Sequence, residues 1–199
     1  MSFFAGTNGM DPSSKLPPFP SIFSGRLRID ACKAIMPRSG GKAFIAEVTV
    51  LTSNLDKLDS QDKNYVAVGS RRSWYQKIPL QDAQTAWGAC IAFLHAALGL
   101  STTKDSAQIE AEVKPFNETF LDAACNEDPS KCVTVKLGGE PTPLPVQFLA
   151  GNEVMLQTSL INTKKTNTIM VNGVATQVPG TFTLHTFSPV PPAATAQTA

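Results

Sequence analysis

Apolar and polar positions alternate along the first third of the chain, which is the pattern of β-strands with one buried face. In residues 26–35, Leu27, Ile29 and Ala31 fall on one face and the charged side chains fall on the other. A glycine-containing turn then leads into residues 42–52, where every second side chain is again apolar. These two segments predict a β-hairpin with a basic tip.

The spacing of apolar positions changes in the middle of the chain. Residues 65–78 predict one or two further strands around a glycine. Residues 80–98 then carry apolar side chains every three or four positions, which predicts an amphipathic helix that stops near Gly99. A second helical region is predicted over residues 104–124, with a kink or a new start at Pro115.

Strand patterns return in the last third of the chain. We predict strands over residues 131–137, 154–161 and 181–187, and a turn-rich loop over residues 138–145. Asn172 and Gly173 stand between two short apolar segments, which predicts a tight hairpin at that position.

This order of elements predicts an α+β, strand-rich fold. Strand groups separated by a helical block favour an OB-like antiparallel barrel, in which two helices are inserted at residues 80–125 between the strand groups. The barrel domain would span residues 26–188. Residues 1–25 predict an extended N-terminal arm, and residues 189–199 predict a flexible Pro/Ala/Thr tail.

The arm contains apolar side chains that could anchor it. They are Phe3, Phe4, Phe19, Ile22 and Phe23. They could dock the arm on its own domain, or on a neighbouring subunit to give a homo-oligomer.

Composition excludes several classes of protein. The 199 residues are 42% hydrophobic and carry 17 basic against 16 acidic side chains, so the chain can bury a core and is not intrinsically disordered. The longest apolar stretch, residues 83–100, is too mixed to span a bilayer, and the first residues do not resemble a secretory signal. We therefore expect no membrane association and a cytoplasmic location.

Catalytic chemistry finds no support in the motifs. There is no phosphate-binding loop, nucleophile elbow or zinc-protease motif. Neither His95 nor His185 has a cysteine or carboxylate close to it in the sequence that would suggest a catalytic triad. We expect no enzyme activity, no cofactor and no metal. The four cysteines, Cys32, Cys90, Cys125 and Cys132, lack the spacing of a zinc site, and we interpret them as reduced thiols. The alternative is that Cys125 and Cys132 form a disulfide bridge or bind a metal together.

The net charge of +1 conceals a separation of charge along the chain. Residues 26–78 hold ten basic and five acidic side chains, whereas residues 105–128 hold seven acidic side chains and one lysine. The early strands are therefore basic and the second helical region is acidic, either as a solvated helix face or as a cation site.

One strand combines cations with aromatic side chains, the two features that a single-stranded nucleic acid requires. Alternation over residues 69–78 puts Arg71, Tyr75 and Lys77 on an exposed face, while Trp74 and Ile78 point inward. Basic residues at the hairpin tip, residues 38–42, and in a predicted polar loop, residues 162–166, could extend this exposed face into a binding groove. The candidate nucleic-acid-binding residues are Arg38, Lys42, Arg71, Arg72, Trp74, Tyr75, Lys77, Lys164 and Lys165. The alternative is that both aromatic side chains belong to the core and the cations are ordinary solvated positions.

Three segments carry a resemblance to a known family. The segment SGGKAFIAEV (residues 39–48), the Gly69-x-x-x-Ser73-Trp74 strand with the helix after it, and the closing strand FTLHTFSP (residues 182–189) resemble bacteriophage single-stranded DNA-binding proteins with an OB-like fold. The resemblance covers about residues 24–188. It implies a non-enzymatic protein that coats single-stranded DNA during phage replication and recombination in the host cytoplasm.

The chain departs from this family at its end. Many such proteins have an acidic tail that recruits replication proteins, whereas this tail is uncharged, and the acidic residues 105–128 could take that role. The alternative function is a virion structural or decoration protein, because proline-rich arms with apolar anchors suit a subunit that interlocks with its neighbours.

Overall fold

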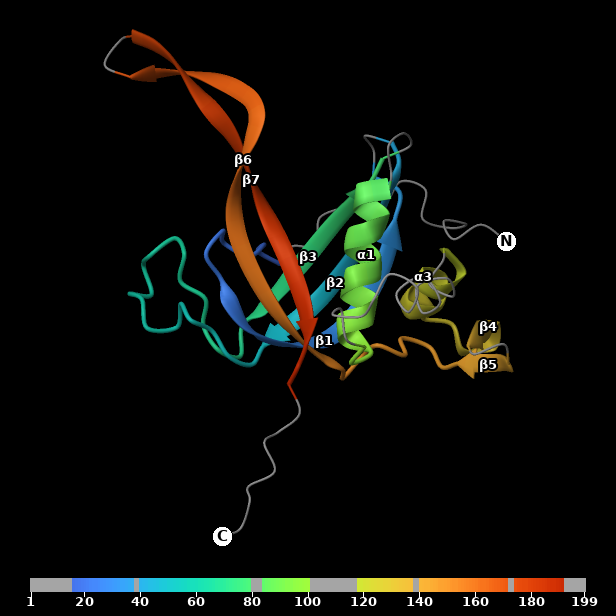
Figure 1. Cartoon of the computed structure of the whole chain (residues 1–199). Coiled ribbons are helices and arrows are strands. Elements are labelled where there is room, and N and C mark those ends of the chain that lie inside the picture. Colours follow the sequence, from blue (N-terminus) through green and yellow to red (C-terminus); the bar gives the residue numbers. More distant parts are fainter. Residues whose placement is uncertain are drawn as a thin grey trace.

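The computed structural model describes residues 16–37, 40–79, 84–100, 118–137, 140–171 and 174–191. They form an α+β, strand-rich fold, which confirms the predicted class (Figure 1). The large antiparallel sheet has the order β3-β2-β1-β6-β7. Its strands are β1 (Ser24–Ile35), β2 (Lys42–Val50), β3 (Arg71–Ile78), β6 (Glu153–Val171) and β7 (Val174–Pro189). The remaining elements are α1 (Gln84–Ala97), α3 (Glu118–Cys125), the 3-10 turn η1 (Pro129–Lys131), and the paired strands β4 (Val133–Leu137) and β5 (Glu140–Leu144).

The β1–β2 hairpin forms as predicted, with one irregularity. Ile29 pairs with Val48 and Ala31 pairs with Glu47, so β1 carries one extra residue between them. This bulge reverses the alternation of the strand. Ala31 therefore lies opposite Glu47 on the face away from the core, and the prediction that it shares a face with Leu27 and Ile29 is wrong.

The turn between β1 and β2 requires glycine. Gly40 and Gly41 have φ values of 78° and 83°, a region that side chains with a Cβ rarely adopt. A Cβ at Gly41 would also lie 2.9 Å from the carbonyl oxygen of Ile78 on β3. The backbone of this turn therefore packs closely against the end of the neighbouring strand.

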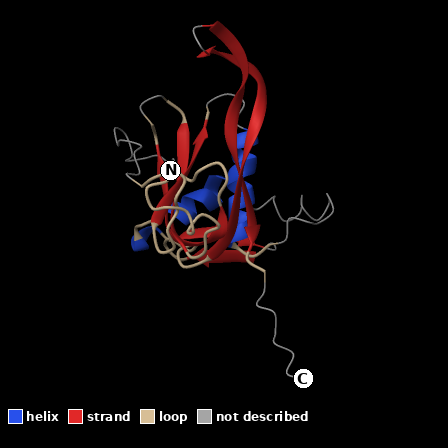
Figure 2. Cartoon of the chain, turned by 90° about the vertical axis from the view of Figure 1, so that its left-hand side faces the viewer, coloured by secondary structure: helices blue, strands red, loops and turns tan. Residues whose placement is uncertain are grey.

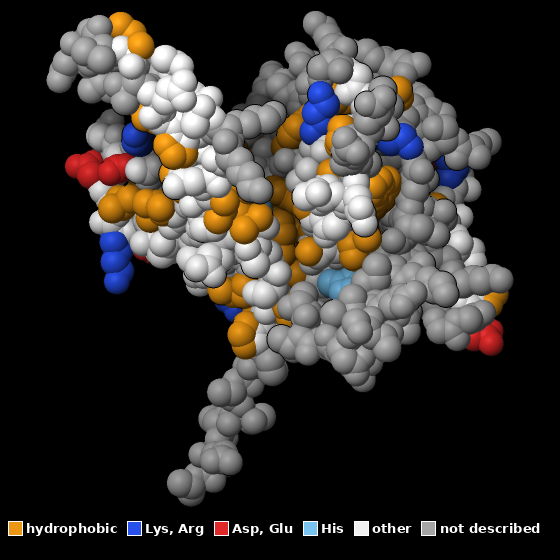
Figure 3. Space-filling view, turned by 45° about the horizontal axis from the view of Figure 1, so that its top comes forward, with side chains coloured by type: hydrophobic (Ala, Val, Ile, Leu, Met, Phe, Trp, Pro, Cys, Tyr) orange, Lys and Arg blue, Asp and Glu red, His pale blue; other side chains and the backbone are white. Residues whose placement is uncertain are grey.

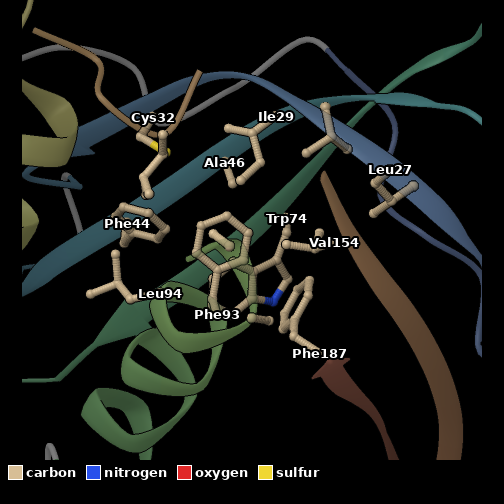
Figure 4. Close-up of a cluster of buried hydrophobic side chains, with 14 of the residues drawn as sticks. Leu27, Ile29, Cys32, Phe44, Ala46, Trp74, Phe93, Leu94, Val154 and Phe187 are labelled. Carbon is tan, nitrogen blue, oxygen red and sulfur yellow. The ribbon is translucent and has the colours of Figure 1, made fainter. Parts of the chain in front are cut away.

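An aromatic cluster forms the centre of the core, between α1 and the sheet (Figure 4). Phe93 of α1 has its ring centroid 5.2 Å from that of Trp74 on β3 and 5.1 Å from that of Phe187 on β7. Trp74 and Phe187 are themselves 4.8 Å apart. β3 and β7 are the two edges of the sheet, so the sheet curls around α1 until side chains from both edges meet. Within the described residues no ladder joins β3 to β7, and the sheet is open there.

The helices follow the sequence in part. α1 lies within the predicted residues 80–98, and the chain leaves it through Gly99, whose φ is 71°. The second helical region, predicted over residues 104–124, is described only from residue 118 onward, as α3. No helix among the described ranges has the length and apolar character needed to cross a membrane.

The described part of the arm, residues 16–23, docks on its own domain. Phe19 and Phe23 are buried and their rings pack 4.7 Å apart, whereas Ile22 is exposed. The amide of Phe23 donates to the Thr158 hydroxyl on β6 at 2.7 Å. The amide of Ser73 on β3 donates to the carbonyl of Pro17 at 3.2 Å, so the arm covers part of this sheet edge. Phe3 and Phe4 lie outside the described residues.

Two predicted loops are strands in the structure. The residues of β5 fall in the predicted loop 138–145, but they pair with β4. Pro141 and Pro143 are exposed in β5, and a strand at a sheet edge tolerates the amide that proline lacks. Residues 162–166, predicted as a polar loop, instead lie inside β6, where the register with β7 shifts between Asn162 and Thr166. The hydrogen-bonded ladder continues on both sides of that shift.

β6 and β7 consequently form one long ribbon that projects from the body of the domain (Figures 1 and 2). β1 pairs with β6 only from Glu153 to Gln157, so the rest of the ribbon lacks β1 as a third strand. Residues 65–70 contain a turn at residues 68–69 but no strand, and β3 begins only at Arg71.

Candidate nucleic-acid interface

The sheet face turned away from α1, here called the outer face, carries the candidate site. Strand register arranges its side chains on β3, β2 and β1 in four rows. These rows are Arg71–Thr49–Arg28, Ser73–Glu47–Ala31, Tyr75–Ile45–Lys33 and Lys77–Ala43–Ile35. Ile35, Ala43 and Ile45 are buried, so the exposed side chains of the last two rows are aromatic or basic.

Tyr75 is the aromatic side chain of this face, and it is 42% exposed. Partial burial raises the pKa of its hydroxyl, so the ring is uncharged at neutral pH. Trp74, the next residue, is only 3% exposed and belongs to the core cluster. The predicted alternation of β3 is therefore correct, and Trp74 leaves the candidate set because no ligand can reach it without opening the core.

Three cations of the outer face are paired with carboxylates. Glu47, which is 9% exposed, accepts from the Lys33 ammonium at 2.7 Å and from the Arg71 guanidinium at 3.3 Å. Asp30 accepts from Arg28 at 3.3 Å and lies 3.5 Å from Nε of Arg71. Three cations thus share two carboxylates, and the face is less positive than the count of basic side chains suggests.

Arg71 and Arg72 are neighbours in the sequence but have different surroundings. Arg71 lies on the outer face with its side chain 54% exposed. Arg72 points to the other side, where it donates to the carbonyls of Pro18 at 2.8 Å and Tyr65 at 3.0 Å. Burial lowers the pKa of its guanidinium below the usual value. Arg72 therefore ties the arm and the 51–70 segment to β3, and it leaves the candidate set.

The other predicted cations are less closely grouped. Lys77 is exposed two residues after Tyr75, and Lys42 begins β2 and is half-buried. Arg38 lies outside the described residues, as do the side chains of Lys164 and Lys165. The backbone of Lys164 is seven residues beyond Gln157, the last β6 residue paired with β1, which is roughly 20 Å along a strand. The ribbon lysines are therefore separate from the Tyr75 face.

Sequence reasoning missed Lys33 and Glu47 as members of the site. Simple alternation puts Lys33 on the apolar face of β1, and only the bulge beside Asp30 turns it outward. The alternation of β2 already places Glu47 on its polar side, so that position was visible in the sequence. Its pairing with Lys33 and Arg71 was not, because it depends on the register between strands.

The cysteines and the metal-binding residue types of the described ranges form no further site. Cys32 and Cys90 are buried, and desolvation raises the pKa of each thiol to about 12, so both remain protonated. Cys125 and Cys132 are free thiols, not a disulfide. No cluster of three or more His, Cys, Asp or Glu side chains in the described ranges could hold a metal ion.

No protein-family model and no curated protein matches the chain.

The two arginines predict contrasting effects on stability. Arg72→Met removes charged hydrogen bonds to two carbonyls and should lower the free energy of unfolding by about 1.5–3 kcal/mol. Arg71→Met removes exposed ion pairs and should cost less than about 1 kcal/mol. Urea unfolding monitored by tryptophan fluorescence measures both. Equal losses in the two variants would contradict the assigned roles.

Proposed function

We propose that this protein is a non-enzymatic phage protein that binds single-stranded DNA through the outer face of β1, β2 and β3, and acts in DNA replication or recombination. The observation that carries the proposal is the position of Tyr75, exposed within a sheet face that also presents Lys33, Arg71 and Lys77. Stacking on an aromatic ring holds a base of any sequence, and the surrounding cations attract the phosphates.

Binding at this face involves an exchange of partners. In the free protein Lys33 and Arg71 are held by Glu47, and phosphate oxygens would compete with that carboxylate for the same donors. The carboxylates keep the two cations in place on the strands. They also lower affinity, because Glu47 and Asp30 repel the phosphates. A moderate, strongly salt-dependent affinity follows from this arrangement.

The architecture supports the same proposal. We propose that the five strands of the large sheet are an OB-like barrel opened between β3 and β7; their order, with α1 and later elements between β3 and β6, is compatible with that fold. OB folds bind oligonucleotides on the face of their second and third strands. In this chain β2 and β3 carry Glu47 and Tyr75, so the candidate site would occupy the corresponding face if the fold is OB-like.

The alternative, a virion structural or decoration protein, has less support. Its main argument was an arm whose apolar anchors engage a neighbouring subunit. Phe19 and Phe23 instead pack within their own domain. Recruitment of replication proteins by the acidic residues 105–128 stays a proposal that rests on sequence alone.

Replacement of Tyr75 tests the stacking platform. Tyr75→Ala should weaken binding of a fluorescent oligothymidylate by about 1–3 kcal/mol, which is roughly 5- to 150-fold, with little change in the salt dependence. Tyr75→Phe keeps the ring and should bind nearly as well as the wild type. The proposal fails if the wild type does not bind at low salt, or if Tyr75→Ala binds with unchanged affinity.

Replacement of Glu47 tests the exchange of partners. Glu47→Gln keeps the shape of the side chain but releases Lys33 and Arg71 from a negative charge, so affinity at low salt should rise by about threefold to tenfold. The gain should shrink at high salt, where charges are screened. Asp128→Asn, a change in the η1 turn after α3, is the matched control and should leave affinity unchanged. A loss of affinity in Glu47→Gln would show that the carboxylate assists binding instead of opposing it.

A further inference from the structure

Apolar side chains in two parts of this domain differ in how they are covered. On the ribbon, hydrophobic side chains lie at the surface among uncharged neighbours, and Phe182 is 48% exposed (Figure 3). On the outer face, by contrast, Ile35, Ala43 and Ile45 are 7%, 0% and 3% exposed and form a small cluster of their own. We call these three residues the outer-face cluster. It is buried although it lies on the side of the sheet away from α1.

The described elements do not account for this burial. Strand register places Lys33 and Tyr75 directly opposite Ile45, while Ala43 and Glu47 lie beside it along β2. Side chains of strands point roughly perpendicular to the sheet, so these neighbours flank the Ile45 side chain and do not lie above it. Within the described residues the cluster contains side chains of β1 and β2 only. A further part of the chain therefore covers it.

The N-terminal arm reaches the outer face next to this cluster. The described arm begins at Leu16, whose carbonyl accepts from the Ser73 hydroxyl at 3.2 Å. Ser73 lies on the outer face of β3, one row away from Tyr75 and Ile45, and it is only 6% exposed. Residues 1–15 are therefore joined to the domain on the same face as the cluster.

The length of this N-terminal segment matches the distance to the cluster. Ile35, the farthest member, is separated from Ser73 by two strands across the sheet and by four residues along it, which is roughly 17 Å. About five or six extended residues span that distance. Met10 lies six residues before Leu16, so its side chain can reach the cluster.

The composition of the segment suits an apolar surface. Residues 1–15 contain the large apolar side chains Phe3, Phe4 and Met10, and their charged side chains are Asp11 and Lys15. The apolar side chains gain free energy when they leave water, and the two charges lie close to the described arm, away from the apolar end of the segment. The segment can therefore bury its first ten residues without burying a charged side chain.

The other long segments outside the described residues are less well placed. Residues 101–117 join α1 to α3, and both helices contribute side chains to the main core on the other side of the sheet. Residues 80–83 lead from β3 into α1, towards that same side. Residues 192–199 contain no large apolar side chain. The N-terminal segment is thus the one that combines attachment on the outer face with apolar anchors.

We propose that residues 1–15 fold back over the outer face and cover the outer-face cluster, with Phe3, Phe4 and Met10 as anchors. The partner of this apolar surface is then the N-terminus of the same chain. Ile45 lies directly opposite Tyr75, so the covered surface borders the proposed DNA site. A DNA strand bound at Tyr75 would meet this segment on one side, and only this consequence rests on the proposed function.

A double-mutant cycle in the full-length chain tests the proposal. The arm variant carries Phe3→Ser, Phe4→Ser and Met10→Ser. Ile45→Ala should raise the unfolding equilibrium constant at least about tenfold more in the wild type than in the arm variant, because truncating a covered side chain costs more than truncating an exposed one. Val48→Ala is the matched control, since Val48 is buried on the inner face of the same strand, and its effect should be equal in both backgrounds. Urea unfolding monitored by tryptophan fluorescence measures all four comparisons.

A photo-crosslinking benzophenone side chain in place of Met10 locates the segment directly. It should attach to β1 or β2 within residues 31–35 or 43–47. Equal effects of Ile45→Ala in the two backgrounds, or attachment confined to α1 or α3, would overturn the proposal. Neither measurement uses DNA, so a wild type that does not bind oligothymidylate would end the proposed function and leave this result unaffected.

Discussion

The contact between the aromatic rings of Trp74, Phe93 and Phe187 determines the shape of the domain. It joins the two edge strands of one sheet to the same turn of α1, although no hydrogen-bonded ladder connects those strands in the described residues. Because all three rings are almost fully buried, the sheet stays curled around the helix. On its opposite face Tyr75 and Arg71 are exposed, although neighbours such as Ile45 are buried. The candidate site is a consequence of that curvature.

On β3, adjacent side chains point to opposite faces of the sheet and have different roles. Trp74 closes the core and Tyr75 reaches solvent, while Arg72 binds backbone carbonyls and Arg71 joins the charged outer face. On this face the positive charges are partly balanced by Glu47 and Asp30, so single-stranded DNA would have to displace these carboxylates from cations that are already held in position. The near-neutral charge of the chain is therefore compatible with a polyanionic ligand, at the cost of moderate affinity.

Features that depend on local periodicity are predictable from the sequence, whereas features that depend on the register between separate strands are not. The alternation of β3 and the helix ending at Gly99 were predictable from the residues themselves. The bulge that turns Lys33 outward was not, because an extra residue is visible only when β1 is paired with β2. Residues 162–166 look like a loop because they are polar, yet β7 continues beside them and keeps them in the ribbon.

Photo-crosslinking of a thymine-analogue oligonucleotide to the wild-type protein, followed by mass spectrometry of the attached peptide, tests the central claim most directly. If the outer face binds DNA, attachment is expected on β3 at or beside Tyr75, with a yield that falls as salt concentration rises. Attachment confined to α1 or α3, on the opposite side of the sheet, or the absence of any crosslink at low salt would contradict it.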